Sequence, residues 1–175
     1  MMTVDQTAYK ETAGVSVATG KVLPEWIDLN GHMNVAYYVL GFDLGLDPLW
    51  DQLGITSEYI ESSNCSTFAV ECHITYQMEL SEGAPLLVTT QVLAYDEKRI
   101  HHFQRMYHAD KHYLAATAEW LALHVDLTSR RVAPWPQSIL SALQKFTERQ
   151  GVLPKPPEVG QKIRLNNPVF ASVDR

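Results

Sequence analysis

Four segments between residues 66 and 125 carry the signals of β-strands, with short turn-like connections rather than helices between them. They cover residues 66–78, 86–95, 99–108 and 113–125. In the first segment, apolar residues at every second position define one predicted face: Phe68, Val70, Cys72, Ile74 and Tyr76. Strands joined by connections this short pair antiparallel, because a parallel crossover needs about a dozen residues or more. This part of the chain therefore predicts an antiparallel sheet.

The first third of the chain predicts one more strand and a long helix. Residues 15–23 form a strand that Pro24 ends, and apolar side chains recur at three- and four-residue steps from residue 34 to about residue 53. Gly45 and the pair Asp47-Pro48 interrupt this helix, because proline removes a helical hydrogen bond and disfavours helix in the residue before it. We expect a kink there, or two consecutive helices with Asp47 capping the second.

Residues beyond the sheet predict a second helix and an irregular tail. The apolar stripe of an amphipathic helix over residues 134–148 consists of Ile139, Leu140, Leu143 and Phe146. The polar residues 56–64 are expected to form a loop. The proline-rich residues 151–160 are expected to pack as an irregular strap or to be mobile.

This order of elements predicts an α+β fold, in which a curved antiparallel sheet of about five strands wraps one long central helix. We divide the chain into an N-terminal arm (1–13), one domain (14–150) and a proline-rich C-terminal tail (151–175). Such a sheet leaves an open edge, which a two-fold homodimer would pair by continuing the sheet. A dimer of dimers is the other assembly left open.

Composition excludes several classes of function. The chain has 175 residues and a net charge of -6, which argues against a general nucleic-acid binder. No apolar run approaches the roughly 18 residues of a membrane span, and the N-terminus lacks the apolar region of a signal peptide. Its two cysteines, Cys65 and Cys72, form neither a disulfide framework nor a metal knuckle. We therefore expect a cytoplasmic protein with no membrane or nucleic-acid partner.

The junction between first strand and helix, EWIDLNGHMNVAYYV (residues 25–39), crowds polar side chains at alternate positions before an apolar run. The motif Asp-x-x-Gly-His-Met-Asn at this junction, with the strand order around it, resembles the hotdog-fold acyl-CoA thioesterases of the 4-hydroxybenzoyl-CoA type. The resemblance covers about residues 15–130. In that family the aspartate acts as base or nucleophile, which implies this role for Asp28, followed here by Gly31 and His32.

A narrower resemblance joins four segments: EWIDLNGHMNVAYYVLGFD, FAVECHITY, KRIHHFQRMYH and LALHVDLTSRRVAPWP. They are similar to the betainyl-CoA thioesterases of carnitine catabolism, which also occur fused to carnitine dehydrogenases. The resemblance implies hydrolysis of a small acyl-CoA, with betainyl-CoA as one candidate, to free acid and CoA. No cofactor is implied, because coenzyme A is part of the substrate.

Two interpretations of the junction compete. Asp and Asn before a helix are routine N-caps. Alternatively, the Asp28 carboxylate attacks the thioester or activates water, and free backbone N–H groups near Asn34, Val35 and Ala36 hold the oxyanion. Asn34 suits a cap or a ligand for water, and His32 could steady Asp28, contact the thioester or close the turn. Gly31 fits a tight turn near the ligand.

Three further groups are candidates for substrate binding, each with a plain structural alternative. Glu71 and His73 lie on the polar face of the first long strand, where they could assist water or balance a cationic acyl group, or merely be solvated. A basic stretch with Lys98, Arg99 and His101 could contact the CoA phosphates or be an exposed hairpin cluster.

Aromatic residues form the third group: Trp26, Tyr37, Tyr38 and Trp120. They could hold a quaternary ammonium, as aromatic faces do, or belong to the core. Trp26 is the leading member because it lies two residues from Asp28.

No metal site is expected, since His108 and His112 lie across a predicted turn and no carboxylate falls at a recognised ligand spacing. Two alternatives to hydrolysis remain: a hotdog dehydratase, and an acyl-CoA binding module without catalysis.

Overall fold

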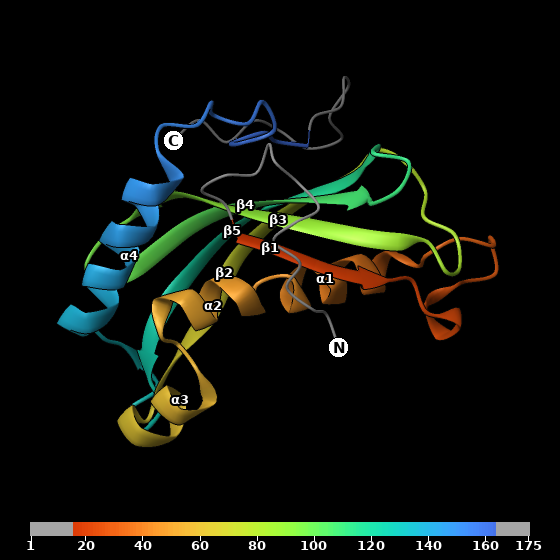
Figure 1. Cartoon of the computed structure of the whole chain (residues 1–175). Helices are drawn as coiled ribbons and strands as arrows, with labels where there is room; N and C mark the ends of the chain where they lie inside the picture. Colours follow the sequence, from red (N-terminus) through yellow and green to blue (C-terminus); the bar gives the residue numbers. More distant parts are fainter. Residues whose placement is uncertain (1–15, 164–175) are drawn as a thin grey trace, which may run out of the picture.

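The computed structural model describes residues 16–163. In this part of the chain one curved sheet covers α1 (Val35–Leu44), and α2 (Asp47–Leu53) continues beneath the sheet (Figure 1). The other elements are strands β1 (Ser16–Lys21), β2 (Cys65–Tyr76), β3 (Pro85–Tyr95), β4 (Arg99–His108), β5 (Leu114–Asp126) and β6 (Arg131–Val132), and helices α3 (Ser57–Ser63) and α4 (Gln137–Gln150). A single turn of 3-10 helix covers Pro24–Trp26. The predicted α+β hotdog fold is confirmed.

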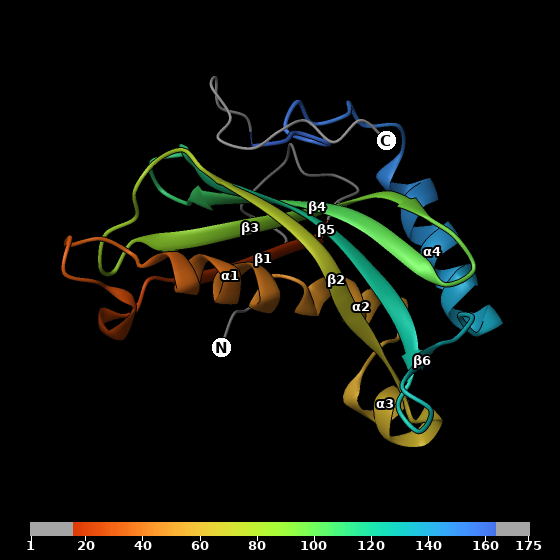
Figure 2. The ribbon, with the colours of Figure 1, turned by 180° about the vertical axis from the view of Figure 1, so that it is seen from behind.

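The sheet has the strand order β1-β3-β4-β5-β2, and its strand pairs are antiparallel. The predicted strand boundaries agree with those observed to within about two residues at each end. β1 and β2 form the two edges, and Figure 2 shows β2 from its open side.

One side-chain prediction for β2 is wrong. A register shift lies between Ala69 and Glu71, so that Ala69 pairs with Ala122 while Cys72 pairs with Trp120. The extra residue, Val70, is a β-bulge that reverses the alternation. Phe68 therefore does not share a face with Cys72, Ile74 and Tyr76.

The long helix divides in two, as one of the two expectations had it. α1 ends near Gly45, where an added Cβ would lie 2.6 Å from Cγ1 of Val88, so this glycine lets the helix end approach the sheet. The predicted cap is wrong: Asp47 is the first residue of α2, and Leu46 holds the cap position without a side-chain hydrogen bond. Residues 56–64 were also wrongly predicted, because Thr56 caps the short helix α3 by accepting a hydrogen bond from the Tyr59 amide.

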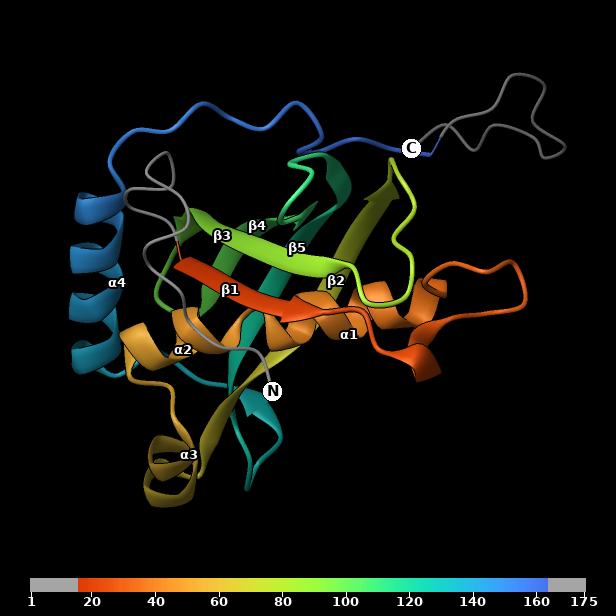
Figure 3. The same ribbon diagram turned by 45° about the vertical axis from the view of Figure 1, so that its right-hand side comes forward.

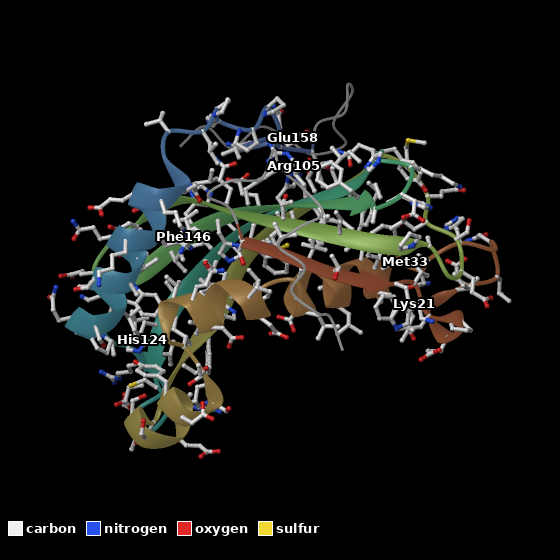
Figure 4. All side chains as sticks on the ribbon, in the orientation of Figure 1. Lys21, Met33, Arg105, His124, Phe146 and Glu158 are labelled. Atoms are coloured by element: carbon white, nitrogen blue, oxygen red, sulfur yellow. The ribbon has the colours of Figure 1, made fainter. Side chains whose placement is uncertain are left out.

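Two apolar clusters fill the space under the sheet. The first lies between α1 and the sheet and includes Phe42, Val88 and Met106, all fully buried. The second joins α2 and α4 to the far end of the sheet through Leu49, Leu143 and their neighbours. Figure 4 labels Met33 near the first cluster, and Phe146 on α4 at the opposite end of the molecule.

Residues 151–163, called the strap below, leave α4 and cross the convex face of the sheet, the face turned away from α1 (Figure 3). The strap has no regular secondary structure, and Pro156 within it is buried. The expected irregular strap is therefore present over these residues. The predicted N-terminal arm, residues 1–13, and the tail beyond residue 163 lie outside the described residues. No helix of residues 16–163 is long and apolar enough to cross a membrane.

Candidate active site at the start of helix α1

A narrow loop precedes α1 and sets two polar side chains beside each other. Ile27 and Met33 form an isolated antiparallel bridge. Between them the Asp28 amide donates to the His32 carbonyl at 3.1 Å, and the Gly31 amide donates to the Asp28 carbonyl at 3.0 Å. The turn requires φ of +81° at Gly31, a conformation that favours glycine. Gly31 therefore lies in a tight turn, as expected, but it does not line the cavity described below, and its contact with a ligand stays a prediction.

Hydrogen bonds from two sides anchor this loop. The Met33 amide donates to the Leu80 carbonyl at 2.8 Å, and the Asn34 amide donates to the Trp26 carbonyl at 2.9 Å. The first bond ties the loop to the connection between β2 and β3, and the second ties it to the 3-10 helix. The start of α1 therefore keeps a fixed position relative to residues 76–80.

Asn34, rather than Asp28, caps the helix. Its side-chain oxygen accepts a hydrogen bond from the Ala36 amide at 3.0 Å, the usual geometry of an N-cap. Its Nδ2 donates to Oδ2 of Asp28 at 3.3 Å, and Oδ1 of Asp28 accepts from the Asn30 amide at 2.8 Å. The carboxylate is held in place but still has acceptor capacity, because a carboxylate offers about four lone-pair sites. Capping and a chemical role for Asp28 are thus compatible.

One backbone donor at the junction is free. The amides of Asn34, Ala36 and Tyr37 all donate hydrogen bonds. Within residues 16–163 the Val35 amide has no hydrogen-bond partner. It lies at the N-terminus of α1, where the helix dipole adds partial positive charge. This amide can therefore stabilise a developing negative charge on a bound carbonyl oxygen.

The His32 ring contacts two groups other than Asp28. Its Nδ1 lies 3.3 Å from the Met33 carbonyl oxygen, and its Nε2 lies 3.6 Å from Oε1 of Glu79. Its ring is therefore oriented by these two groups, and of the three predicted roles this placement favours contact with a ligand in the pocket.

A cavity of about 280 Å³ opens beside these groups. The loop and α1 contribute Asp28, His32, Met33, Asn34, Val35 and Tyr38, and the end of β2 with the connection after it contributes Tyr76, Gln77, Met78 and Glu79. The first wall contains residues of the predicted motif, whereas the second wall was not predicted from the sequence. Residues 76–79 are about 45 positions away along the chain, and no local pattern signals that they face Asp28.

Three of the predicted aromatic binding residues do not line this cavity: Trp26, Tyr37 and Trp120. Trp26 is only 6% exposed, and its ring stacks on Tyr37 with centroids 5.5 Å apart and planes 10° from parallel. Trp120 is buried in the core, where it stacks with His102. Tyr38 does line the cavity, at right angles to Tyr76, with ring centroids 5.2 Å apart.

Glu71, His73 and His101 meet on the convex face instead, beneath the strap. With Glu119 they line a second cavity of about 360 Å³. Nε2 of His101 lies 2.8 Å from Oε1 of Glu119, and Oε2 of Glu119 accepts a hydrogen bond from the Gly160 amide at 2.7 Å. The structure therefore brings these three predicted residues together, but not with Asp28.

Lys98 and Arg99 lie in the tight turn between β3 and β4, beside α4 and far from the start of α1. Nζ of Lys98 is 3.1 Å from Glu97, and Arg99 forms an ion pair with Asp96 at 2.6 Å. Hydrogen bonding and charge from Arg99 lower the pKa of Asp96 to about 2. Neither basic residue lines the cavity beside Asp28.

Comparison with known proteins places the chain among thioesterases. A family model described as the thioesterase-like superfamily matches residues 22–143. The betainyl-CoA thioesterase of Pseudomonas aeruginosa is 38% identical over 144 residues, which are 82% of this chain and 91% of that protein. An L-carnitine dehydrogenase/betainyl-CoA thioesterase of Rhizobium meliloti is 35% identical over 82% of this chain and 29% of its own length.

Solved structures agree. A Staphylococcus aureus protein solved in complex with CoA superimposes with a TM-score of 0.82 at 27% identity, over 90% of this chain and 99% of that chain. A candidate thioesterase of Pseudomonas putida has a TM-score of 0.72 at 31% identity, over 84% of this chain and 94% of its own.

Proposed function

This chain belongs to the thioesterase-like superfamily, and we propose that it hydrolyses betainyl-CoA, or a similar small acyl-CoA, at the cavity beside Asp28. The observation that carries the proposal is the pairing of a held carboxylate, Asp28, with the unpartnered amide of Val35 at one helix start. A thioester needs both a group that delivers the nucleophile and a donor for the oxyanion. The sequence-based assignment to a family of acyl-CoA thioesterases is confirmed.

In the proposed reaction the thioester carbonyl oxygen accepts a hydrogen bond from the Val35 amide. Either Asp28 takes a proton from water as the water oxygen adds to the carbonyl carbon, or the Asp28 carboxylate adds directly and water then hydrolyses the anhydride. In both routes the carbon–sulfur bond breaks and CoA leaves as the thiolate. An oxyanion donor contributes about 3 to 4 kcal/mol to lowering such a barrier.

Asn34 positions both reacting groups. Its oxygen caps α1, and its Nδ2 donates to the Asp28 carboxylate. His32 lines the same cavity and would contact the substrate rather than Asp28. No cofactor takes part in this scheme, since coenzyme A enters as part of the substrate. The cytoplasmic location stays a prediction from the sequence.

A homodimer is the proposed assembly, and two exposed surfaces support it. β2 is an edge strand whose Val70 is 53% exposed. The outer face of α1 also exposes apolar side chains, Val35, Val39 and Leu40. A second copy that continues the sheet at β2 would cover both surfaces and remove the open edge. Whether two dimers pair further stays a prediction.

The assignment of Asp28 is tested by Asp28→Asn, measured as thiol release from betainyl-CoA. We expect a loss of about 10³-fold in kcat, the scale of a general base, with CoA-ester binding and thermal unfolding unchanged. Asp51→Asn is the matched control, because Asp51 is exposed on α2 and lies outside the cavity. Undiminished hydrolysis would refute the role of Asp28, and binding without hydrolysis by the unaltered protein would favour a binding module instead.

The assembly is tested separately by Val70→Lys, which puts a charge on the open edge of β2. We expect sedimentation velocity to show a shift from dimer to monomer. Val152→Lys is the control, because Val152 is fully exposed on the strap. A monomeric unaltered protein, or a Val70→Lys protein that stays dimeric, would contradict this interface.

A further inference from the structure

The far wall of the cavity beside Asp28 is aromatic and acidic, and the reaction scheme does not use it. Tyr38 and Tyr76 meet at 81°, with ring centroids 5.2 Å apart. Both line the cavity, together with the apolar side chains of Met33 and Met78. Two rings at right angles present a concave corner to a bound group. Such corners suit a bulky apolar group, and a cationic one above all, because the faces of aromatic rings carry partial negative charge.

The two rings differ in accessibility in a way that fits this use. Tyr38 is 4% exposed and is held in the first apolar cluster, so it is a rigid wall. Tyr76 is 49% exposed, at the end of the edge strand, and its ring is open to an incoming group. Burial, with smaller contributions from the nearby Glu79 and Tyr76, raises the pKa of Tyr38. The phenol is therefore neutral at physiological pH, and its ring faces the cavity as an uncharged aromatic.

Carboxylates outnumber basic side chains among the described residues that line the cavity, where His32 is the basic one. Glu79 and Asp28 are its two carboxylates, and no lysine or arginine of residues 16–163 lines it. The Glu79 side chain is 76% exposed at the rim, with Oε1 3.6 Å from Nε2 of His32. A cationic acyl group entering this cavity is attracted, whereas an anionic acyl group is repelled. The negative charge at the rim thus complements the aromatic corner.

We propose that Tyr38, Tyr76 and Glu79 form the subsite that recognises the cationic end of the acyl group, with Glu79 selecting its charge. The inference rests on the proposed function, and it assigns specificity to residues outside the Asp-x-x-Gly-His-Met-Asn motif. It also replaces the earlier candidate, Trp26, whose face is occupied by Tyr37. Tyr76 and Glu79 of the subsite lie on a different segment from Asp28 and Val35, which carry the reaction. Each group can therefore be altered without the other.

A pair of isosteric substrates tests charge recognition directly. Betainyl-CoA carries a trimethylammonium group, and 3,3-dimethylbutyryl-CoA places a neutral tert-butyl group of the same shape at the same position. We expect the unaltered protein to prefer the cationic ester in kcat/KM by at least about tenfold. The preference should shrink as ionic strength rises, because Glu79 is at the rim and its charge is screened by salt.

Two variants then separate the parts of the subsite. Glu79→Gln should lower kcat/KM for the cationic ester about tenfold, while kcat/KM for the neutral ester should stay within about twofold of the unaltered protein. Tyr76→Leu should lower kcat/KM for the cationic ester about two- to thirtyfold, the range for loss of one cation–π contact. Its effect on kcat/KM for the neutral ester should be smaller. Glu82→Gln is the matched control, because Glu82 is exposed in the same connection but does not line the cavity.

Each outcome has a distinct meaning. Equal loss for both esters in Glu79→Gln would overturn the subsite and indicate that Glu79 acts through His32. An unaltered protein that hydrolyses the two esters equally would also overturn it, while leaving thioester hydrolysis intact. Failure to release thiol from either ester, or from acetyl-CoA, would instead refute the proposed function itself.

Discussion

The two faces of the sheet carry similar sets of polar residues with different surroundings. At the start of α1, Asp28 is held by Asn30 and Asn34 and opens onto a cavity. On the convex face Glu119 is held by His101 and by the Gly160 amide, beneath the strap. Both carboxylates therefore have partners on both oxygens.

What separates the two sites is the group that stands beside each carboxylate. Next to Asp28 lies the backbone amide of Val35, which has no partner among the residues that the structure describes. Beside Glu119 the His101 ring and the Gly160 amide are already bonded to Glu119. A cluster of Glu and His thus marks a reactive site only where a donor is left for the substrate, whereas a cluster whose members satisfy one another fastens two segments together. Four predictions test this contrast, from the largest expected effect to the smallest.

The largest effect is expected from Asn34→Ser, which separates the two functions of Asn34. Serine is as good an N-cap as asparagine, so thermal unfolding should stay within about 0.5 kcal/mol of the unaltered protein. It lacks the Nδ2 that donates to Asp28, so kcat should fall about 10- to 100-fold. Steady-state kinetics and thermal melts on the same preparation measure both. A variant with normal kcat would show that the bond between Asn34 and Asp28 has no role in the chemistry.

The adjacent residues His101 and His102 allow the two faces to be compared further. His101 is bonded to Glu119 on the convex face, and His102 is buried on the other side of the strand. His102 packs between Trp50 and Trp120, and its Nδ1 has no hydrogen-bond partner in the described part of the chain. Burial lowers the pKa of this ring to about 3. In the unfolded chain His102 takes up a proton near the ordinary pKa of about 6.5, whereas in the folded protein it stays neutral at that pH.

Stability should therefore fall as the pH drops from about 6.5 toward 3, by up to about 1.4 kcal/mol per pH unit from this residue. The free energy of unfolding, measured with urea at a series of pH values, should change less with pH in His102→Leu than in the unaltered protein. His73→Gln is the control, because His73 is only partly buried. An identical slope in His102→Leu would mean that the ring accepts a proton in the folded state.

A smaller effect is expected from Glu119→Gln on the convex face. The change removes the charge that strengthens the hydrogen bonds to His101 and the Gly160 amide, so unfolding should cost about 1 kcal/mol less. Thiol release should be unchanged, because Glu119 does not line the cavity beside Asp28. Limited proteolysis of the strap should become faster in this variant. A large loss of activity would place the convex face in the catalytic machinery.

The smallest effect is expected from the double variant Glu71→Gln, His73→Gln. Both residues line the cavity under the strap and neither lines the one beside Asp28. We expect kcat/KM for betainyl-CoA to stay within about threefold of the unaltered protein, the range of distant surface changes. A loss of tenfold or more would restore the hypothesis that these residues bind substrate.

Much of the fold and half of the site could be predicted from local patterns. Alternation marks the strands, and the crowding of polar residues at 28–34 marks the reacting corner, because both signals lie within a few consecutive positions. The bulge at Val70 and the short helix α3 were not predicted. One extra residue in a strand leaves no signal in the sequence, and seven mostly polar residues show no clear period.

The second wall of the cavity, residues 76–79, could not be predicted for a different reason. Tyr76 and Glu79 face Asp28 only because the Met33 amide bonds to the Leu80 carbonyl across the fold. That contact depends on sheet register, which a single sequence does not reveal. Contact of Glu71 and His73 with substrate stays a prediction.

The hydrogen bond between Met33 and Leu80 has a consequence for how such proteins diverge. It joins two segments through backbone atoms alone, so side chains on either segment can be replaced without breaking the joint. Residues 76–79 are therefore free to vary in charge and size while the corner at Asp28 keeps its shape. In evolutionary terms, a lineage could acquire a new acyl preference by changing a few residues in one connection and inherit the chemistry intact.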